Sequence, residues 1–189
     1  GTQLNAITIA EDGGPVVAGS FIGQMTAGST TLTAAGDPVG QNRFRDDALV
    51  AHLRGDTGAW VWANGAGGAY DDSFTMVAAQ SDGVAIVAGQ TATAVTIGPS
   101  VIGSASSGLL ARIDGTGAWE SARSTGLREM RGMSLDSCST PYIAGWWQGT
   151  LTYTVTSPST VLTSNPTNRW DGYAAKVSTN ACVAPSSGA

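Results

Sequence analysis

Few side chains in this sequence have the types and spacing that catalysis requires. The chain carries one histidine, His52, at the strand position that Arg112 and Lys176 fill in two similar segments. An alternating strand would present this residue outward as a basic or polar side chain. A zinc hydrolase needs several nitrogen or sulfur ligands around its metal, and one histidine does not supply them. We therefore predict no catalytic residue and no cofactor.

Carboxylates supply the remaining candidates for chemistry. Glu129, with Glu120 and Asp114 nearby, could form the acid pair of a glycoside hydrolase, but the sequence does not fix the separation that this reaction needs. A hydrolase is therefore the weakest of the functions considered. Adjacent aspartates could bind Ca²⁺, which takes about six to eight oxygen ligands. None lies in an EF-hand or a Gly-Asp repeat loop, so these are weak calcium candidates: Asp46, Asp47, Asp71 and Asp72.

Aromatic residues make the best case for a binding surface. Trp60 and Trp119 recur at one position of a repeated phrase and are most simply packing residues. Neighbours on a strand face opposite sides, so Trp146 and Trp147 can both be buried only if both faces of their sheet are covered. Rings of this kind stack on sugars or anchor protein partners, or they plug the end of an array. The candidate binding residues are Trp62, Trp146, Trp147, Tyr153 and Trp170.

Two phrases that occur three times indicate the elements that must position these side chains. A β-branched residue followed by Ala-Gly ends at Gly19, Gly89 and Gly145, and an apolar-Ala-basic-apolar phrase follows later in each copy. The copies lie about 60 residues apart, a period typical of propeller blades and other repeat arrays. The second phrase occupies residues 50–53, 110–113 and 174–177.

Each repeat contains the signals of four antiparallel strands. A short β-branched run turns at an Asp position into the Ala-Gly strand, with Asp12, Asp82 and Asp136 at equivalent places, where Asp caps its own backbone. A Thr-rich insert follows, which predicts a projecting hairpin or an extra edge strand, and then a third strand and a Gly-Ala-Trp strand. We predict a single repeat domain, 1–189, with blades at 6–68, 73–126 and 127–183 and a tail at 184–189. The third blade lacks its fourth strand.

Composition excludes several functional classes. Charged residues form only 12% of the 189 residues, against about a quarter in ordinary globular domains. The net charge of −5 argues against a nucleic-acid surface, which needs clustered Lys and Arg. No run of about 18 apolar residues predicts a membrane span. The first residues carry no signal-peptide pattern, so an export signal is either already removed or was never included.

The two cysteines favour an oxidising compartment. Cys138 falls in the turn after the first strand of the third repeat, and Cys182 follows its third strand. In an antiparallel sheet both turns project from the same end, so the two residues could approach within bonding distance. A disulfide between them would staple the repeat that lacks its fourth strand. This prediction supports an exported location, with a pair of free thiols as the alternative.

The repeated phrases resemble a known family. An Ala-Gly strand, a Thr-rich insert, an Asp-x-Leu-Val-Ala-basic-Leu strand and then Thr-Gly-Ala-Trp are similar to the bacterial surface β-propeller repeats called SBBP repeats. The resemblance covers residues 6–182 and is closest in the first copy. It implies a propeller-type fold in secreted or surface-attached bacterial proteins, generally without assigned catalytic residues. It implies little about a ligand.

Three blades are too few to close an ordinary propeller, which has about four to eight. An open array would leave apolar faces at its ends and an unpaired edge after Val177, which soluble proteins normally cover. The chain could be a fragment of a longer propeller, its sheets could pack into a compact prism, or another chain could supply the missing strand. A β-trefoil is the alternative fold, although its repeats of about 40 to 50 residues are shorter.

The sequence as a whole predicts an all-β protein that acts by contact. We expect an exported, non-enzymatic structural or adhesive module at the bacterial cell surface, able to self-assemble through an open sheet edge by strand or face complementation. Its partners would be identical or related subunits or a cell-surface component, and neither nucleic acid nor a membrane span is expected. A carbohydrate-binding, lectin-like protein is the main alternative, favoured if Trp146, Trp147 and Trp170 are exposed and clustered.

Overall fold

The computed structural model describes residues 1–36, 45–80, 84–103, 107–127, 129–148, 150–153, 160–163 and 170–177, with the backbone alone at 151–153 and 160–163. Every regular element in these ranges is a β-strand, which confirms the all-β class. The described part of the chain accordingly holds no helix that could span a membrane. The chain divides into two compact units, Gly1–Ser124 and Thr125–Ala189, where one domain was expected.

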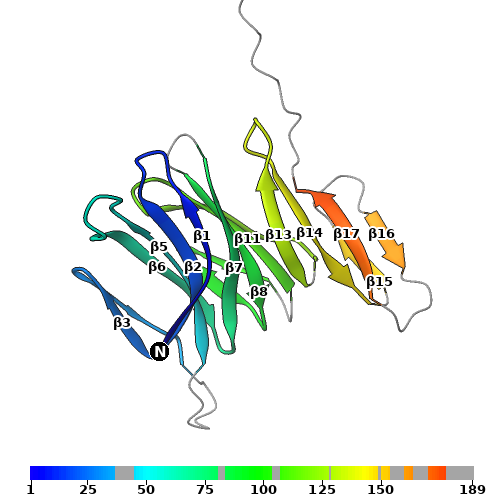
Figure 1. Cartoon of the computed structure of the whole chain (residues 1–189). Helices are drawn as coiled ribbons and strands as arrows, with labels where there is room; N and C mark the ends of the chain where they lie inside the picture. Colours follow the sequence, from blue (N-terminus) through cyan, green and yellow to red (C-terminus); the bar gives the residue numbers. More distant parts are fainter. Residues whose placement is uncertain are drawn as a thin grey trace, which may run out of the picture. The chain divides into compact units, whose positions relative to one another are not determined.

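The first unit contains two antiparallel sheets, each built on four strands of one repeat (Figure 1). Sheet 1 has the order β1, β2, β5, β6, and sheet 2 has the order β7, β8, β11, β12. Sheet 1 is formed by the first copy of the repeat and sheet 2 by the second, and the strands follow one another in the same order in both. The bounds are β1 (Thr2–Ile9), β2 (Pro15–Ile22), β5 (Asp46–Leu53), β6 (Trp60–Gly68), β7 (Asp72–Ala79), β8 (Ala85–Thr91), β11 (Ser107–Ile113) and β12 (Trp119–Ser124).

The second unit contains a three-stranded antiparallel sheet from the third copy. Sheet 3 has the order β13, β14, β17, with no fourth strand among the described residues. This sheet thus ends at the strand that precedes the missing Gly-Ala-Trp phrase. The bounds are β13 (Met130–Leu135), β14 (Pro141–Trp147) and β17 (Asp171–Lys176).

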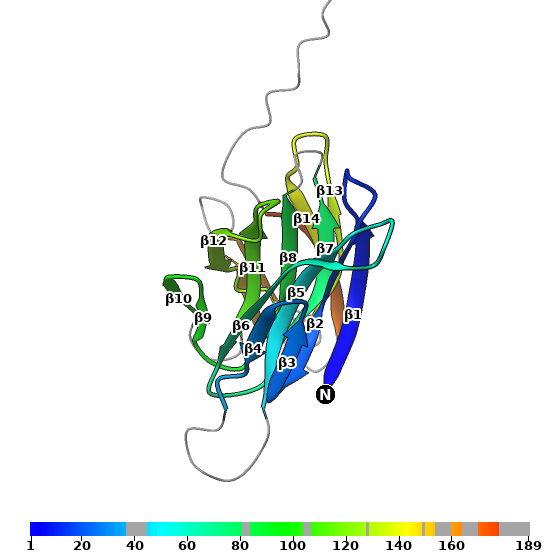
Figure 2. The ribbon, with the colours of Figure 1, turned by 90° about the vertical axis from the view of Figure 1, so that its left-hand side faces the viewer.

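The Thr-rich inserts form two-stranded hairpins between the second and third strands of each repeat, of which Figure 2 labels the first two and Figure 1 the third. The hairpin of the second repeat also adds to the edge of the first, because β9 pairs with β6 at Gly67–Thr96 and Gly68–Val95. Sheet 1 is thereby extended to six strands. The hairpin strands are β3 (Gln24–Ala27) with β4 (Thr30–Thr33), β9 (Val95–Ile97) with β10 (Ser100–Ile102), and β15 (Thr150–Tyr153) with β16 (Thr160–Thr163).

The described strands close neither a propeller nor a barrel. A β-trefoil is built around a barrel, so this alternative does not describe the fold. A sheet that does not close has two edge strands with unpaired backbone groups, and soluble proteins usually cover or protect such edges.

The core of the first unit lies where sheet 1 packs against sheet 2. We call the side of sheet 1 that carries Val16, Ala18 and Val50 its front face, and these side chains are buried. They share one hydrophobic cluster with Phe74 and Val87 of sheet 2. We call the side of sheet 2 that carries Phe74 and Val87 its back face. The back face of sheet 1 is partly covered by its own hairpin, in a cluster of Val17, Ala27, Ala51 and Ala63 with Met25, Leu32 and Leu53 around it.

The repeated Ala-Gly phrase has a structural cause. The first strand of every repeat contains a β-bulge opposite this phrase, between Leu4 and Ala6, Phe74 and Met76, and Met130 and Gly132. A bulge bends its strand and increases the local twist, and here the backbone beside the bulge lies close to the paired strand. A Cβ on the glycine would therefore collide with a backbone oxygen of the first strand, as Gly89 would with Ser73. Only glycine fits at this position.

This collision predicts the effect of adding one methyl group. We expect Gly89→Ala to lower the free energy of unfolding by about 1–3 kcal/mol, because the strand must shift away from its partner. Gly132→Ala is the control, since a Cβ there meets nothing within 4 Å. Denaturant unfolding followed by circular dichroism measures both. An equal loss in the two variants would contradict the explanation.

Candidate functional site

His52 is buried, and the expectation that it faces outward is wrong. The residue is 7% exposed on the front face of sheet 1, because that face is covered. Its Nε2 lies 3.2 Å from Oδ1 of Asp12, and its ring centroid lies 5.7 Å from that of Trp62. Asp12 also accepts the backbone N–H of Gly14, which with His52 holds its pKa below the ordinary value. The pair anchors the turn between β1 and β2.

The equivalent basic residues make the same kind of contact. Lys176 lies 3.6 Å from Asp136, the turn residue of the third repeat. Arg112 donates to Gln80 at 2.6 Å and pairs with Glu120. Asp136 also accepts the backbone N–H groups of the turn that it begins, as predicted for a capping Asp. Asp82, the third predicted turn aspartate, lies outside the described residues. The basic position therefore contacts a polar group at or next to the turn between the first two strands of each repeat.

The carboxylates of the hydrolase hypothesis each have a partner. Glu120 pairs with Arg112, and Glu129 lies 2.6 Å from the guanidinium of Arg131. Asp114 accepts from the hydroxyl and N–H of Thr116 and the N–H of Ala118, which lowers its pKa. Glu129 belongs to the second compact unit and the other two to the first. Their contacts are those of turns and ion pairs.

The calcium candidates are likewise engaged by protein groups. Asp46 accepts the hydroxyl of Ser20 at 3.1 Å, and Asp71 lies 3.2 Å from Arg45. Asp47 and Asp72 each accept backbone N–H groups. In the described ranges no three His, Cys, Asp or Glu side chains come together as a metal site. Asp46 and Asp47 thus bond within the first repeat, and Asp71 and Asp72 bond around the junction of the first two repeats.

Two of the candidate binding tryptophans are buried. Trp62 donates its indole N–H to the carbonyl of Gly115 at 3.1 Å, and so fastens sheet 1 to a turn of sheet 2. Trp147 packs beside Tyr173 at 6.2 Å, and burial raises the pKa of that tyrosine. Neither indole presents a ring face to solvent, which removes both from the candidate surface. The side chain of Tyr153 lies outside the described residues.

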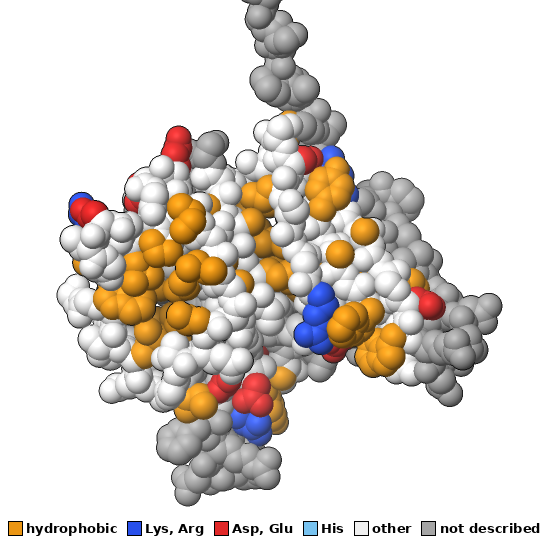
Figure 3. Space-filling view, viewed as in Figure 1, with side chains coloured by type: hydrophobic (Ala, Val, Ile, Leu, Met, Phe, Trp, Pro, Cys, Tyr) orange, Lys and Arg blue, Asp and Glu red, His pale blue; other side chains and the backbone are white. Residues whose placement is uncertain are grey.

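The other two tryptophans are exposed and lie together. Trp146 is 41% exposed and Trp170 is 59% exposed, with their ring centroids 6.4 Å apart in an edge-to-face arrangement. The guanidinium of Arg131 lies 4.6 Å from the centroid of Trp146, a cation–π contact. Figure 3 shows basic and hydrophobic side chains next to one another over this part of the second unit. We call these three residues the aromatic cluster.

The aromatic cluster belongs to a larger exposed face that the positions of the tryptophans alone do not predict. Tyr142, Ala144 and Trp146 alternate along β14 and are all exposed, as are Gly172 and Ala174 of β17. By repeat register this is the front face of sheet 3, equivalent to the face of sheet 1 that carries Val16 and Ala18. The signal was present in the sequence, because equivalent positions of a repeat lie on equivalent faces.

The predicted disulfide involves a residue outside the description. Cys138 lies in the turn between β13 and β14, where its N–H donates to Asp136. Cys182 lies outside the described residues, so the pairing of these two residues stays a prediction.

Comparison with known proteins gives no further guide to this arrangement. No family model matches the chain, and no curated protein is found as a relative.

Buried Asp72 predicts a pH-dependent stability. Burial raises its pKa to about 7, against 3.8 for a free side chain, although it accepts N–H groups from Gly68 and Ala92. Between these values the unfolded chain releases the proton first, so the native state loses stability as the pH rises. We expect the melting temperature to fall from about pH 5 to about pH 8, and to fall less in Asp72→Asn. Equal pH profiles for the two proteins would refute this role of Asp72.

The disulfide prediction has its own measurement. The mass of the intact, unreduced protein should be two hydrogens below that of the dithiol, and alkylation should require a reductant. Cys138→Ser should then leave one cysteine that alkylates without reduction. Rapid alkylation of both cysteines in the unreduced, denatured protein would show that the bond does not form.

Proposed function

We propose that this chain is an exported, non-enzymatic structural module whose exposed sheet faces join it to further copies of itself. The observation that carries the proposal is the contrast between equivalent faces. In sheet 1 the front face is covered by the next repeat, and in sheet 3 the same face is open. The resemblance to SBBP repeats and the predicted disulfide support an extracellular setting.

The front faces differ sharply in exposure. Val16 and Ser20 of sheet 1 are 2% and 3% exposed, whereas their equivalents in sheet 3, Tyr142 and Trp146, are 42% and 41% exposed. The larger side chains of sheet 3 would bury more apolar area if another sheet covered them. This face therefore has the character of an interface core with basic residues at its border.

The complementary surface is the back face of sheet 1. Phe74 of sheet 2 is fully buried against the preceding repeat, but its equivalent in sheet 1, Leu4, is 55% exposed. Ile7 and Ile9 alternate along the same strand and are 66% and 61% exposed. Figure 3 shows the hydrophobic side chains gathered over this side of the first unit. Apolar residues this exposed and this close together mark contact surfaces.

The contact between sheets 1 and 2 within the chain is a model for the proposed contact between two copies. At the bulge of β1, Asn5 donates to the hydroxyl of Ser73 at 2.9 Å and to the carbonyl of Phe74 at 3.0 Å, across the joint between sheets 1 and 2. The equivalent bulge residue in sheet 3 is Arg131, a longer donor that rests on Trp146. A second copy seated on sheet 3 by its β1 would offer Arg131 the carbonyl of Leu4.

Such a contact joins two different surfaces. The front face of sheet 3 of one copy meets the back face of sheet 1 of the next, so the interface is heterologous and can be repeated. Among the described strands β17 pairs only with β14, so a face-to-face joint of this kind would leave its other edge available to a strand from a neighbour. The product is an array of modules without any catalytic step.

A carbohydrate-binding role is the second candidate. Trp146 and Trp170 are exposed and clustered, which is the arrangement that a lectin-like surface needs. Against it, Arg131 already covers one face of Trp146. Binding of glycans by the monomer through this cluster would favour this role over assembly.

Self-association of the 189-residue chain tests the proposal. We expect light scattering on a sizing column to show a molar mass that rises with concentration. Ile7→Glu and Trp146→Glu should each abolish this rise, because a buried unpaired charge is costly in the interface. Val101→Glu is the control, since Val101 is 71% exposed and belongs to neither face.

Mixing the two variants separates this joint from non-specific aggregation. Ile7→Glu keeps an intact sheet 3, and Trp146→Glu keeps an intact sheet 1, so an equimolar mixture should form a dimer and nothing larger. A wild-type chain that stays monomeric at millimolar concentration would overturn the proposal.

A further inference from the structure

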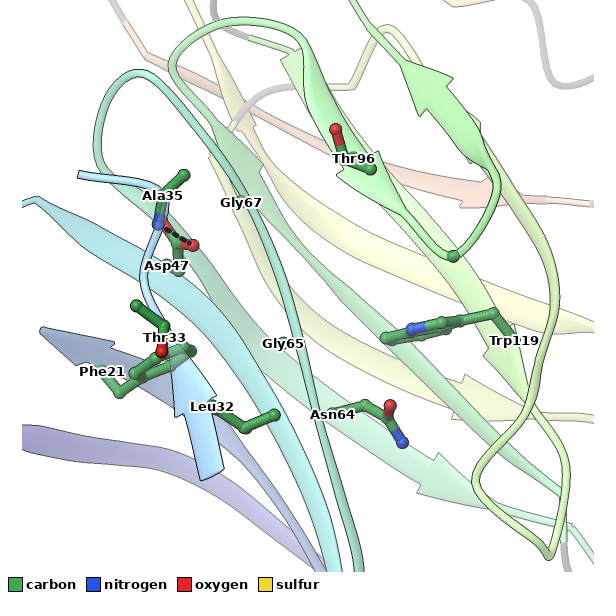
Figure 4. Close-up of a pocket in the computed structure, with 11 residues that line it drawn as sticks. Phe21, Leu32, Thr33, Ala35, Asp47, Asn64, Gly65, Gly67, Thr96 and Trp119 are labelled. Atoms are coloured by element: carbon green, nitrogen blue, oxygen red, sulfur yellow. Dashed lines mark hydrogen bonds between the residues drawn. The ribbon is translucent and has the colours of Figure 1, made fainter. Parts of the chain in front are cut away.

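A cavity in the first unit lies apart from the exposed faces. It has a volume of about 370 Å³ and follows the edge of β6, between the hairpin β3–β4 and the hairpin β9–β10 (Figure 4). Asn64, Gly65 and Gly67 of β6 form one wall, and Leu32 and Thr33 come from β4. β9 pairs with β6 at Gly67 and Gly68, and the cavity begins beside this short pairing.

A buried carboxylate lines this cavity and has an unused oxygen. Asp47 is 5% exposed, and its Oδ2 accepts the N–H of Ala35 at 2.8 Å. Its Oδ1 is buried and has no partner among the described residues. A buried polar atom without a hydrogen bond costs about 1–3 kcal/mol, so a ligand that donates to Oδ1 would recover this free energy. Burial raises the pKa of Asp47 as well.

Two glycines of β6, which have no side chains, leave room for this carboxylate and for Phe21. A Cβ on Gly67 would lie 2.0 Å from the carboxyl carbon of Asp47, and one on Gly65 would lie 3.2 Å from the ring of Phe21. The two glycines thus let Asp47 and Phe21 lie flat against β6. The glycines in the sequence Asn64-Gly65-Ala66-Gly67-Gly68 therefore allow this strand to form the wall of the cavity.

The rest of the lining combines ring faces with neutral polar groups. Trp119 lies across the cavity from Asp47, and Asn64, Thr33 and Thr96 add amide and hydroxyl groups (Figure 4). None of the described residues that line the cavity is Lys, Arg or His. An anionic ligand would find no counter-charge here. A neutral polyol offers hydroxyl donors to the carboxylate and an apolar ring face to the indole.

We propose that this cavity is a binding site for a neutral sugar ring of monosaccharide size. A rotation of the Asp47 carboxyl group turns Oδ1 from its buried position toward the cavity, where one hydroxyl donates to it, and the apolar face of the ring lies against Trp119. The site goes beyond the assembly function, because its residues belong to neither of the two joining faces. It also differs from the aromatic cluster of the second unit, which is the other candidate for glycans.

Titration of the folded chain with four sugars tests the site. The probes are D-glucose, D-galactose, D-mannose and N-acetyl-D-glucosamine, followed by saturation-transfer NMR and calorimetry. We expect millimolar or tighter binding of at least one sugar, weakened at least about tenfold in Asp47→Asn. Asp56→Asn, an exposed carboxylate outside the cavity, is the charge-matched control.

A second variant guards against misfolding of Asp47→Asn. Thr96 is exposed at the rim, so Thr96→Arg should obstruct the cavity, leave the melting temperature unchanged and abolish binding. Failure of all four sugars to bind the folded wild-type chain would overturn the proposal. Binding that survives both variants and disappears in Trp146→Ala would also overturn it, because the sugar would then lie on the aromatic cluster.

Discussion

The packing of the front face of sheet 1 on the back face of sheet 2 is the interaction on which the rest of the first unit depends. It buries Val16, Ala18 and Val50 against Phe74 and Val87 in one cluster. Small side chains let the two sheets approach, and the close approach lets Asn5 and Trp62 bond to backbone of the next repeat. The cavity along β6 lies at the border of this joint. The hydrogen bonds between the repeats and the position of the cavity therefore both depend on the packing of these two sheet faces.

The sequence could predict the strands, but not which faces are covered. Alternation assigns His52 and Val50 to one face of β5, and a lone strand would present that face to water. The neighbouring sheet reverses the outcome, so His52 is buried and bonds to Asp12. The same reasoning missed Trp62, whose partner is a carbonyl in the next repeat. Burial by a neighbour is a long-range property, and local periodicity does not contain it.

The candidate site was only partly visible in the sequence for a similar reason. The pair Trp146 and Trp147 could be assigned to opposite faces, and the structure exposes the first and buries the second. Asp47 is one of four calcium-candidate aspartates in the sequence, whereas its place in the structure depends on Gly67 of β6, where a Cβ would collide with the carboxyl group. The sequence shows that the Ala-Gly phrase repeats, but the β-bulge opposite it, which requires the glycine, can be seen only once the two strands are paired.

Magnitudes constrain how strongly the open faces can join. Leu4, Ile7 and Ile9 already lose part of their surface to the sheet, so covering them contributes less than the about 1.5–3 kcal/mol of a full burial each. Trp146 and Tyr142 add comparable amounts from the other face, while association costs about 4–15 kcal/mol. A single joint is therefore weak in solution. When modules are held side by side on a surface, the effective concentration replaces much of that cost, and a weak joint is then enough to hold an array together.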